Sequence, residues 1–174
     1  MGEVESAVEQ EPYVITIDYT RCSGCRVCEL ACSLSHYQEC SSNLSRIRLV
    51  EVTVAGVVAA APTLCQNCCD PPCEKICPTG ATRRDPESNL MTVAEELCIG
   101  CKGCVHGCPF GATAINPYRD AAFRCDQCGG FPVCVEVCPE NVLSYWPLSV
   151  VSNRLRRKRK KMSANFSLPA PTVL

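Results

Sequence analysis

Apolar residues along this chain gather in short runs separated by polar residues and turn signals. The segments 13–17 and 90–93 are rich in β-branched residues and predict short β-strands. Two further runs, residues 47–52 and 56–58, predict a hairpin that turns near residues 55–56. These short elements indicate a small α+β protein.

Cysteine dominates the remaining pattern. Eighteen of the 174 residues are cysteine, and sixteen of them fall into four groups of four. Groups one and three have the same spacing, C-x2-C-x2-C-x3-C, whereas groups two and four have longer second intervals. The order therefore alternates as an internal repeat. In chain order the groups are Cys22, Cys25, Cys28 and Cys32; Cys65, Cys68, Cys73 and Cys77; Cys98, Cys101, Cys104 and Cys108; and Cys125, Cys128, Cys134 and Cys138.

The segments around these groups indicate a short helix and the boundaries of the domains. Residues 26–32 of group one can begin a short helix after the tight cysteine loop. Aromatic residues make up only 6% of the chain, so large side chains cannot supply most of the packing. The sequence predicts an acidic N-terminal arm over residues 1–12, a cysteine-rich domain over 13–147 and a basic extension over 148–174.

The extension contains seven of the seventeen basic residues within residues 154–161. A helix through residues 154–162, capped by Ser152 or Asn153, would be followed by an extended end. Two interpretations remain open for this tail. It is either a solvated, disordered segment or a docking element for a catalytic partner or a second copy of the chain.

The N-terminal residues and the many cysteines predict the cellular compartment. The first residues lack the basic start and apolar core of a secretory signal, and the longest apolar run, near residues 54–61, is too short to span a bilayer. We therefore expect a cytoplasmic protein without a membrane span, in which cysteines bind metal rather than form structural disulfides.

The spacing favours iron–sulfur clusters over zinc. C-x2-C-x2-C-x3-C-P is the bacterial 4Fe-4S run, whose fourth cysteine serves the other cluster of a pair. Proline follows the last cysteine of groups two to four, and Ser33 stands there in group one. Zinc ligands come as pairs with long spacers, whereas here three cysteines crowd into seven residues twice. Cys40 and Cys69 fall outside the pattern, although Cys69 could replace its neighbour Cys68.

With these groups, and with CQNCCDPPCEKICPTGA at residues 65–81, the chain resembles the four-cluster ferredoxin-like subunits of molybdenum and tungsten pterin enzymes. The iron–sulfur subunit of dimethyl sulfoxide reductase is of this type. The resemblance covers residues 13–146, and it looks closest to the small subunits of tungsten aldehyde oxidoreductases and benzoyl-CoA reductases. It implies tandem bacterial-ferredoxin-like modules, with short strands and helices around four 4Fe-4S clusters.

The resemblance also implies which cysteines share a cluster, with groups one and four exchanging their last cysteines and groups two and three doing the same. The implied sets are Cys22, Cys25, Cys28 and Cys138; Cys125, Cys128, Cys134 and Cys32; Cys65, Cys68, Cys73 and Cys108; and Cys98, Cys101, Cys104 and Cys77. Some relatives carry tryptophan in place of one ligand of group three, but Cys101 is present here, so four cubanes are expected.

Other polar residues add little chemistry. His36 is either a surface or capping residue or a group that tunes a nearby cluster, and His106 is expected to shield or hydrogen-bond a cluster. Arg83 and Arg84 are expected to be solvated charges, although they follow group two closely enough to raise the potential of a cluster. The sequence contains no catalytic triad, nucleotide-binding glycine loop or paired carboxylates, so a non-catalytic role is expected.

The predicted function is single-electron transfer between a large pterin-containing catalytic subunit and a redox partner, such as a flavin subunit or a ferredoxin. Two alternatives remain: an iron–sulfur-dependent regulator or nucleic-acid-binding protein, suggested by the basic tail, and a freely diffusing polyferredoxin. We expect no nucleic-acid partner, because sensing requires one labile cluster rather than four.

Overall fold

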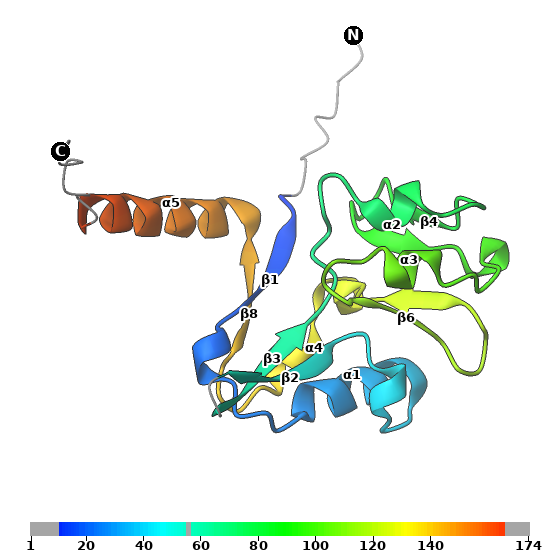
Figure 1. The fold of residues 1–174 in the computed structure, drawn as a ribbon, viewed down its shortest axis with the longest axis horizontal. Helices are drawn as coiled ribbons and strands as arrows, with labels where there is room; N and C mark the ends of the chain where they lie inside the picture. The colour runs from blue at the N-terminus through cyan, green and yellow to red at the C-terminus, as the bar shows by residue number, and fades with distance from the viewer. Residues whose placement is uncertain (1–10, 55–56, 166–174) are drawn as a thin grey trace, which may run out of the picture. The chain divides into compact units, whose positions relative to one another are not determined.

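The computed structural model describes residues 11–54 and 57–165, which belong to two compact units. Residues 15–145 form the larger unit, and residues 11–14 and 146–165 belong to the smaller one. Most of the predicted acidic arm lies outside the described residues. The helices and strands, shown in Figure 1, are β1 (Tyr13–Ile17), α1 (Val27–Tyr37), β2 (Arg48–Val54), β3 (Val57–Thr63), α2 (Pro72–Lys75), β4 (Thr82–Arg84), β5 (Met91–Val93), α3 (Gly103–His106), β6 (Thr113–Ile115), β7 (Ala122–Arg124), α4 (Val133–Glu136), β8 (Leu143–Pro147) and α5 (Leu148–Asn165).

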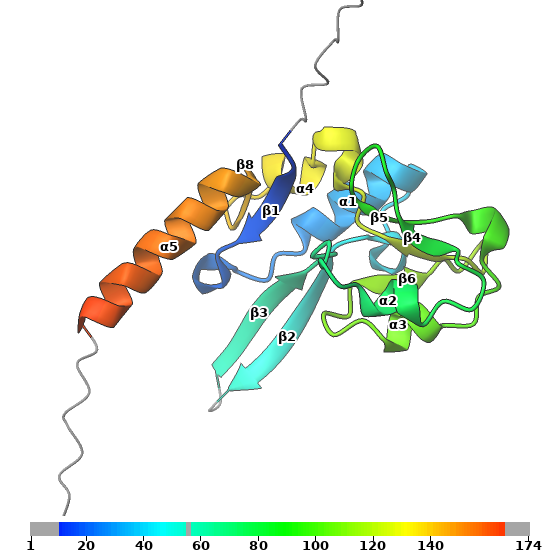
Figure 2. The same ribbon diagram turned by 90° about the horizontal axis from the view of Figure 1, so that it is seen from above.

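The cysteine repeat is also a structural repeat. Each group places its third cysteine at the second position of a helix: Cys28 in α1, Cys73 in α2, Cys104 in α3 and Cys134 in α4. All four side chains are buried. Helix α1 packs beside α4, and α2 packs beside α3 (Figure 2). Group one therefore meets group four, and group two meets group three.

Within residues 11–54 and 57–165, the strands form four two-stranded sheets. The predicted hairpin is confirmed: β2 and β3 pair antiparallel from Arg48–Thr63 to Val54–Val57, and the turn residues between them lie outside the described residues. The predicted strands at 13–17 and 90–93 are confirmed as β1 and β5. Strand β1 pairs with β8, β4 with β5 and β6 with β7. These last three partnerships were not predicted, because the sequence did not indicate β4, β6, β7 or β8.

The core of the larger unit is built from aliphatic side chains and cysteines. One buried cluster combines Ile15, Ile47 and Leu64 with cysteines of groups one and four. A second combines Met91 and Ala122 with Cys73 and Cys104 of groups two and three. Since the apolar residues of both clusters surround cysteines, the position of the cysteine groups is coupled to the packing of the core.

The basic extension begins its helix earlier than expected. Helix α5 starts at Leu148 rather than at the predicted cap, Ser152 or Asn153. The first amide groups are satisfied from another part of the chain, because Leu148 donates to the carbonyl of Pro12 at 2.9 Å and Ser149 donates to the carboxylate of Glu11. A cap so distant in sequence cannot be recognised from local residues. The expected extended end at residues 169–171 lies outside the described residues.

Helix α5 is long but strongly basic. Its Arg154 guanidinium lies over the ring of Trp146, 4.6 Å from the ring centroid. Within the described residues, no helix combines the length and the apolar character that crossing a bilayer requires.

Candidate cluster-binding sites

The first hollow joins group one to the end of group four. Three cysteines of group one line it together with Cys138: Cys22, Cys25 and Cys28. Cys28 is buried and Cys25 is exposed. Burial raises the pKa of the Cys28 thiol to about 11, and the charges of Cys25 and Cys138 act in the same direction. The amide of Val142 donates to the Cys138 sulfur at 3.3 Å.

The second hollow joins group two to the end of group three. It is lined by Cys65, Cys68, Cys73 and Cys108. The Cys108 sulfur accepts a hydrogen bond from the amide of Ala112 at 3.4 Å, which repeats the arrangement at Cys138. Within this hollow, one guanidinium nitrogen of Arg124 lies 3.1 Å from the sulfur of Cys73.

The third hollow reverses this exchange, because it joins group three to the end of group two. It is lined by Cys77, Cys98, Cys101 and Cys104. The amide of Thr82 donates to the Cys77 sulfur at 3.5 Å, and the amide of Ala122 donates to the Cys98 sulfur at 3.3 Å. Although burial acts against it, the Thr82 amide and the Thr79 hydroxyl lower the pKa of Cys77 to about 7.

The remaining four of the sixteen grouped cysteines form the fourth set, composed of Cys32, Cys125, Cys128 and Cys134. Burial raises the pKa of Cys134 to about 12, and the charges of Cys32 and Cys128 add to this shift. Burial likewise raises the pKa of Cys125, where Cys134 and Cys32 contribute in the same way. Cys32, Cys125 and Cys134 belong to one buried cluster. The His36 imidazole lies 3.9 Å from the Cys32 sulfur, and its ligand atom is within 4.8 Å of the Cys128 sulfur.

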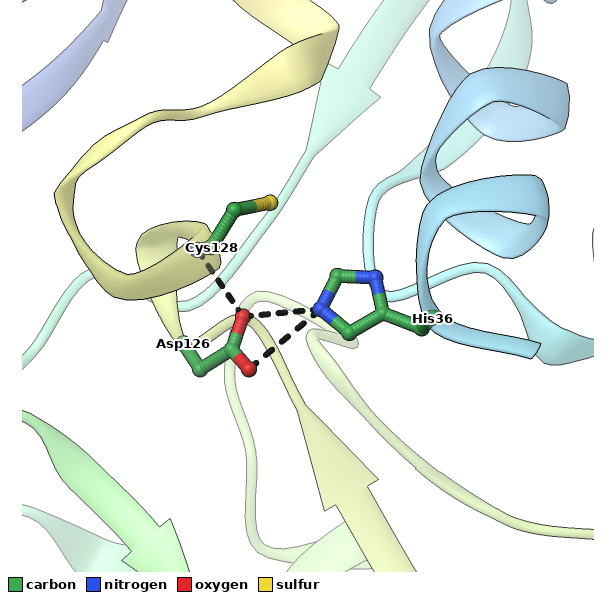
Figure 3. A group of neighbouring side chains, drawn as sticks. All are labelled: His36, Asp126 and Cys128. Carbon is green, nitrogen blue, oxygen red and sulfur yellow. Dashed lines mark hydrogen bonds and ion pairs between the residues drawn. The ribbon is translucent and has the colours of Figure 1, made fainter. Parts of the chain in front are cut away.

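A polar network lies beside the fourth set (Figure 3). The imidazole of His36 reaches the Asp126 carboxylate with Nε2 at 3.1 Å and the Cys32 carbonyl with Nδ1 at 2.8 Å. Arg46 forms an ion pair with the same carboxylate, and its amide donates to the Cys32 sulfur at 3.3 Å. Asp126 in turn accepts the amide of Cys128 at 3.0 Å.

This network shifts the pKa of its members. The hydrogen bond with Asp126, followed by that with Cys32, raises the pKa of His36 to about 10. Although burial opposes it, the bond from His36 and the charge of Arg46 lower the pKa of Asp126 to about 2. Burial also opposes ionisation of Cys32, but His36 and the Arg46 amide outweigh it and lower that pKa.

The side chains of His36, Asp126 and Cys128 are close enough to surround a single ion, since their ligand atoms lie within 4.8 Å of one another. However, the Asp126 carboxylate already contacts two cationic side chains, so a third cation is disfavoured. His36 is a hydrogen-bonding residue of which only 12% of the side chain is exposed, and its effect on the potential of a nearby cluster stays a prediction.

The structure also places the two cysteines outside the groups, and it places Arg84 and His106. Cys40 and Cys69 are exposed, and neither lines one of the three hollows; Cys68, rather than Cys69, lines the second. Arg84 is not a simple solvated charge, because its guanidinium donates to the carbonyls of Cys68 and Asn67. His106 is exposed at the end of α3.

The chemistry of these donor sets fits a thiolate-bound cluster. All eighteen cysteines are free of disulfide bonds, and buried thiols such as Cys28 and Cys134 ionise readily only when a cationic centre replaces their protons. The exchange of the last cysteine between paired groups is typical of 4Fe-4S cubanes, whose four irons each bind one thiolate.

Comparison with known proteins agrees with this geometry. The 4Fe-4S dicluster domain family matches residues 57–146, and the 4Fe-4S binding domain matches residues 19–38. The chain belongs to the 4Fe-4S dicluster domain family. This family match covers more than half of the chain. The prediction that the cysteines of this chain bind 4Fe-4S clusters is therefore confirmed.

Several relatives of this 4Fe-4S dicluster protein are named for redox systems. It is 34% identical to the B subunit of anaerobic dimethyl sulfoxide reductase of Escherichia coli strain K12, over 90% of this chain and 82% of the relative. It is 41% identical to the polyferredoxin-like subunit of aliphatic sulfonate oxidoreductase of Pyrococcus furiosus, over 75% of this chain and 74% of the relative. It is 33% identical to the electron transport protein HydN of Escherichia coli, over 87% and 98%.

A solved structure of the active site complex BamBC of benzoyl coenzyme A reductase is also similar, with a TM-score of 0.43 and 21% identity over 84% of this chain and 88% of the other. Among the sequence relatives, one is named an electron transport protein and two are named as chains or subunits of oxidoreductases. Electron transfer through 4Fe-4S clusters is accordingly the function that the family indicates for this 4Fe-4S dicluster protein.

Proposed function

We propose that the protein binds four 4Fe-4S clusters, one in each of the three hollows and one in the fourth set. The observation that supports this most strongly is the exchange of cysteines between groups: Cys138 completes the first hollow, Cys108 the second and Cys77 the third. When bound, such clusters take up and release one electron at a time.

The residues around the thiols have a role of their own. Backbone amides of Thr82, Ala112 and Val142 each donate to the last cysteine of a group, and the Arg46 amide does so for Cys32 in group one. Such N–H···S bonds favour negative charge on sulfur and so favour the reduced state of whatever the thiolates bind. The backbone itself thereby contributes to the reduction potential.

We infer that the protein serves as the non-catalytic electron-transfer subunit of an oxidoreductase. Its partner would be a large pterin-containing catalytic subunit, of the tungsten aldehyde oxidoreductase type or a related molybdenum enzyme. A flavin subunit or a ferredoxin would exchange electrons with it. The redox names of the relatives support a subunit role, and the abundance of unpaired thiols supports a reducing, cytoplasmic location.

The decisive experiment is anaerobic purification of the tagged full-length protein from its native host, followed by metal analysis of the protein and of whatever copurifies. The proposal expects about sixteen irons per chain and a large partner containing tungsten or molybdenum. About eight irons or fewer would contradict four clusters. A protein with a full iron content but without any large partner would indicate a free polyferredoxin instead.

The basic helix α5 favours one other function, binding to nucleic acid. Its test uses the same preparation, with binding to duplex DNA and to RNA measured across a salt series. Tight binding that survives physiological salt would favour a regulator, whereas weak binding that disappears with salt is expected here.

A further inference from the structure

The side chain of Arg124 is an unusual feature of the larger unit, because it is a buried cation beside cysteines. Arg124 ends strand β7 and directly precedes Cys125, yet its side chain turns toward groups two and three. The residue is only 4% exposed. It therefore lies in the interior rather than among the solvated charges of the surface.

The contacts of Arg124 contain no carboxylate. One terminal nitrogen donates to the Cys73 sulfur at 3.1 Å, the other donates to the Thr82 hydroxyl at 3.3 Å, and Nε has no hydrogen-bond partner. Among the described residues no acidic side chain forms an ion pair with it. Arg46, whose Nε is likewise buried without a hydrogen-bond partner, differs because it pairs with Asp126.

Thr82 connects this arginine to the neighbouring hollow. It is 1% exposed, and it lines the third hollow, where its amide donates to the Cys77 sulfur. Burial raises the pKa of Cys104 in the same hollow, and the Thr82 hydroxyl acts against this shift. The guanidinium thus contacts a cysteine of the second hollow directly and the third hollow through one hydroxyl group.

The electrostatic field of Arg124 also reaches both hollows. Burial raises the pKa of Cys65, in the second hollow, and of Cys104, in the third, and in both cases the charge of Arg124 acts in the opposite direction. An arginine stays protonated in proteins, and burying it without an anion is strongly unfavourable. The nearby thiolates and what they bind are the available source of negative charge.

We propose that Arg124 is the shared counter-ion of the two clusters held in the second and third hollows, and that it raises the reduction potential of both. This inference rests on the proposed function, since it requires a cluster in each hollow. The added electron makes a cluster more negative, so a fixed positive charge stabilises the reduced form more than the oxidised form. Because one cation acts on both clusters, their reduction potentials rise together. The difference between the two potentials therefore stays small, and an electron can pass from one cluster to the other.

The test is a redox titration of the anaerobic holoprotein, followed by paramagnetic resonance, with each signal assigned through single cysteine variants. Arg124→Met removes the charge but retains most of the side-chain volume. We expect the equilibrium constant for one-electron reduction to fall at least tenfold, or about 59 mV, for the clusters of the second and third hollows. The other two clusters should shift much less, and Arg124→Lys should restore most of the loss.

Arg119→Met is the matched control, because Arg119 is an exposed arginine paired with Glu95, where solvent screens its charge. This variant should leave all four potentials unchanged. The proposal is overturned if R124M retains its iron and its potentials, or if all four clusters shift equally.

Thr82→Val provides a second, nearly isosteric variant in case R124M does not assemble. It keeps the backbone amide that donates to Cys77 but removes the hydroxyl that links Arg124 to the third hollow. We expect the cluster of the third hollow to fall in potential while the second changes less, and an unchanged third cluster would reject the link. A wild-type protein with fewer than four clusters would instead reject the proposed function.

Discussion

The imidazole Nε2 of His36 lies 3.1 Å from Oδ1 of Asp126, although ninety residues separate them in sequence. His36 is on α1, and Asp126 lies between the first two cysteines of group four. The same carboxylate binds Arg46 and accepts the amide of Cys128. The Asp126 side chain therefore links group one to group four. The cysteines of these two groups make up the first hollow and the fourth set.

Replacement of Asp126 by alanine should weaken this connection. Asp126→Ala leaves two partly buried cations without their anion and removes the acceptor for the Cys128 amide. The Asp126 side chain is 40% exposed, so we expect a loss of about 1–3 kcal/mol in the free energy of unfolding. Urea unfolding of the anaerobic holoprotein, followed by cluster absorbance, measures this loss.

Asp126→Asn is the matched control, because asparagine keeps an acceptor for the Cys128 amide while removing the charge. Its destabilisation should be smaller than that of D126A. If D126A unfolds at the same urea concentration as the wild type, the carboxylate does not stabilise the junction between the groups.

Much of this site could be predicted from the sequence, because the cysteine ligands of each group are close together along the chain. Runs of β-branched and other apolar residues also predicted β1, β5 and the β2–β3 hairpin. The strands β4, β6, β7 and β8 were not predicted, and the first three of these are too short for a periodic pattern. Strand β5 is equally short, but the run at residues 90–93 indicated it. Asp126 and Arg124 were missed for another reason: each acts on cysteines of a distant group, and no local spacing encodes such a contact.

Group three contains a glycine at which both the backbone and the available space exclude a side chain. Gly100, between Cys98 and Cys101, has a φ of +64°, and a Cβ there would lie 2.6 Å from the carbonyl oxygen of Asp120. Gly100→Ala should therefore cost more than the roughly 1–2 kcal/mol of left-handed backbone strain and should reduce iron occupancy in the third hollow. Iron analysis and thermal unfolding of the anaerobic protein measure both effects.

Gly111→Ala separates the two causes, because Gly111 has a similar φ of +60° but nothing within 4 Å of its Cβ position. It should show the backbone strain alone and retain its iron. Equal destabilisation of the two variants would mean that the contact with Asp120 relaxes without cost.

One cysteine from each group provides a direct test of the ligand assignment. Replacing Cys22, Cys65, Cys98 or Cys125 by alanine should remove or convert one cluster and lower the stability of the whole larger unit, since metal binding and folding are coupled. Cys40→Ala should be nearly silent, because Cys40 is exposed and lines none of the hollows. Iron content and paramagnetic resonance report both outcomes, and loss of a full cluster in C40A would refute the assignment.

Two adjacent cysteines, Cys68 of group two and Cys69 outside the groups, permit a sharper comparison. Cys68 lines the second hollow, and Cys69 is exposed beside it. Cys68→Ala should lose about four irons or convert the cluster to a three-iron form, whereas Cys69→Ala should keep its full content. The reverse result would show that Cys69 is the ligand and that the loop shifts by one residue when the cluster binds.

The basic extension can be tested by truncation after Pro147, which removes α5 and all seven clustered basic residues. The remaining chain keeps ten basic and eighteen acidic residues, and bound clusters make it more acidic still. A basic helix attached to such a protein is attracted to acidic protein surfaces, either on the catalytic partner or on a second copy. Truncation should leave the iron content intact but weaken assembly, as measured by sedimentation of the purified components.

The salt dependence of assembly shows whether the basic extension docks through its charge. If docking depends on charge, association of the intact chain should fall steeply between low and high ionic strength, because the Debye length shrinks from about 30 Å at 0.01 M to about 3 Å at 1 M. A full-length variant with glutamine at Arg156, Arg157 and Lys158 keeps the helix but lowers its charge, and it should lie between the intact and truncated proteins. If the truncated chain assembles as well as the intact one at every salt concentration, the extension is a solvated segment with no docking role.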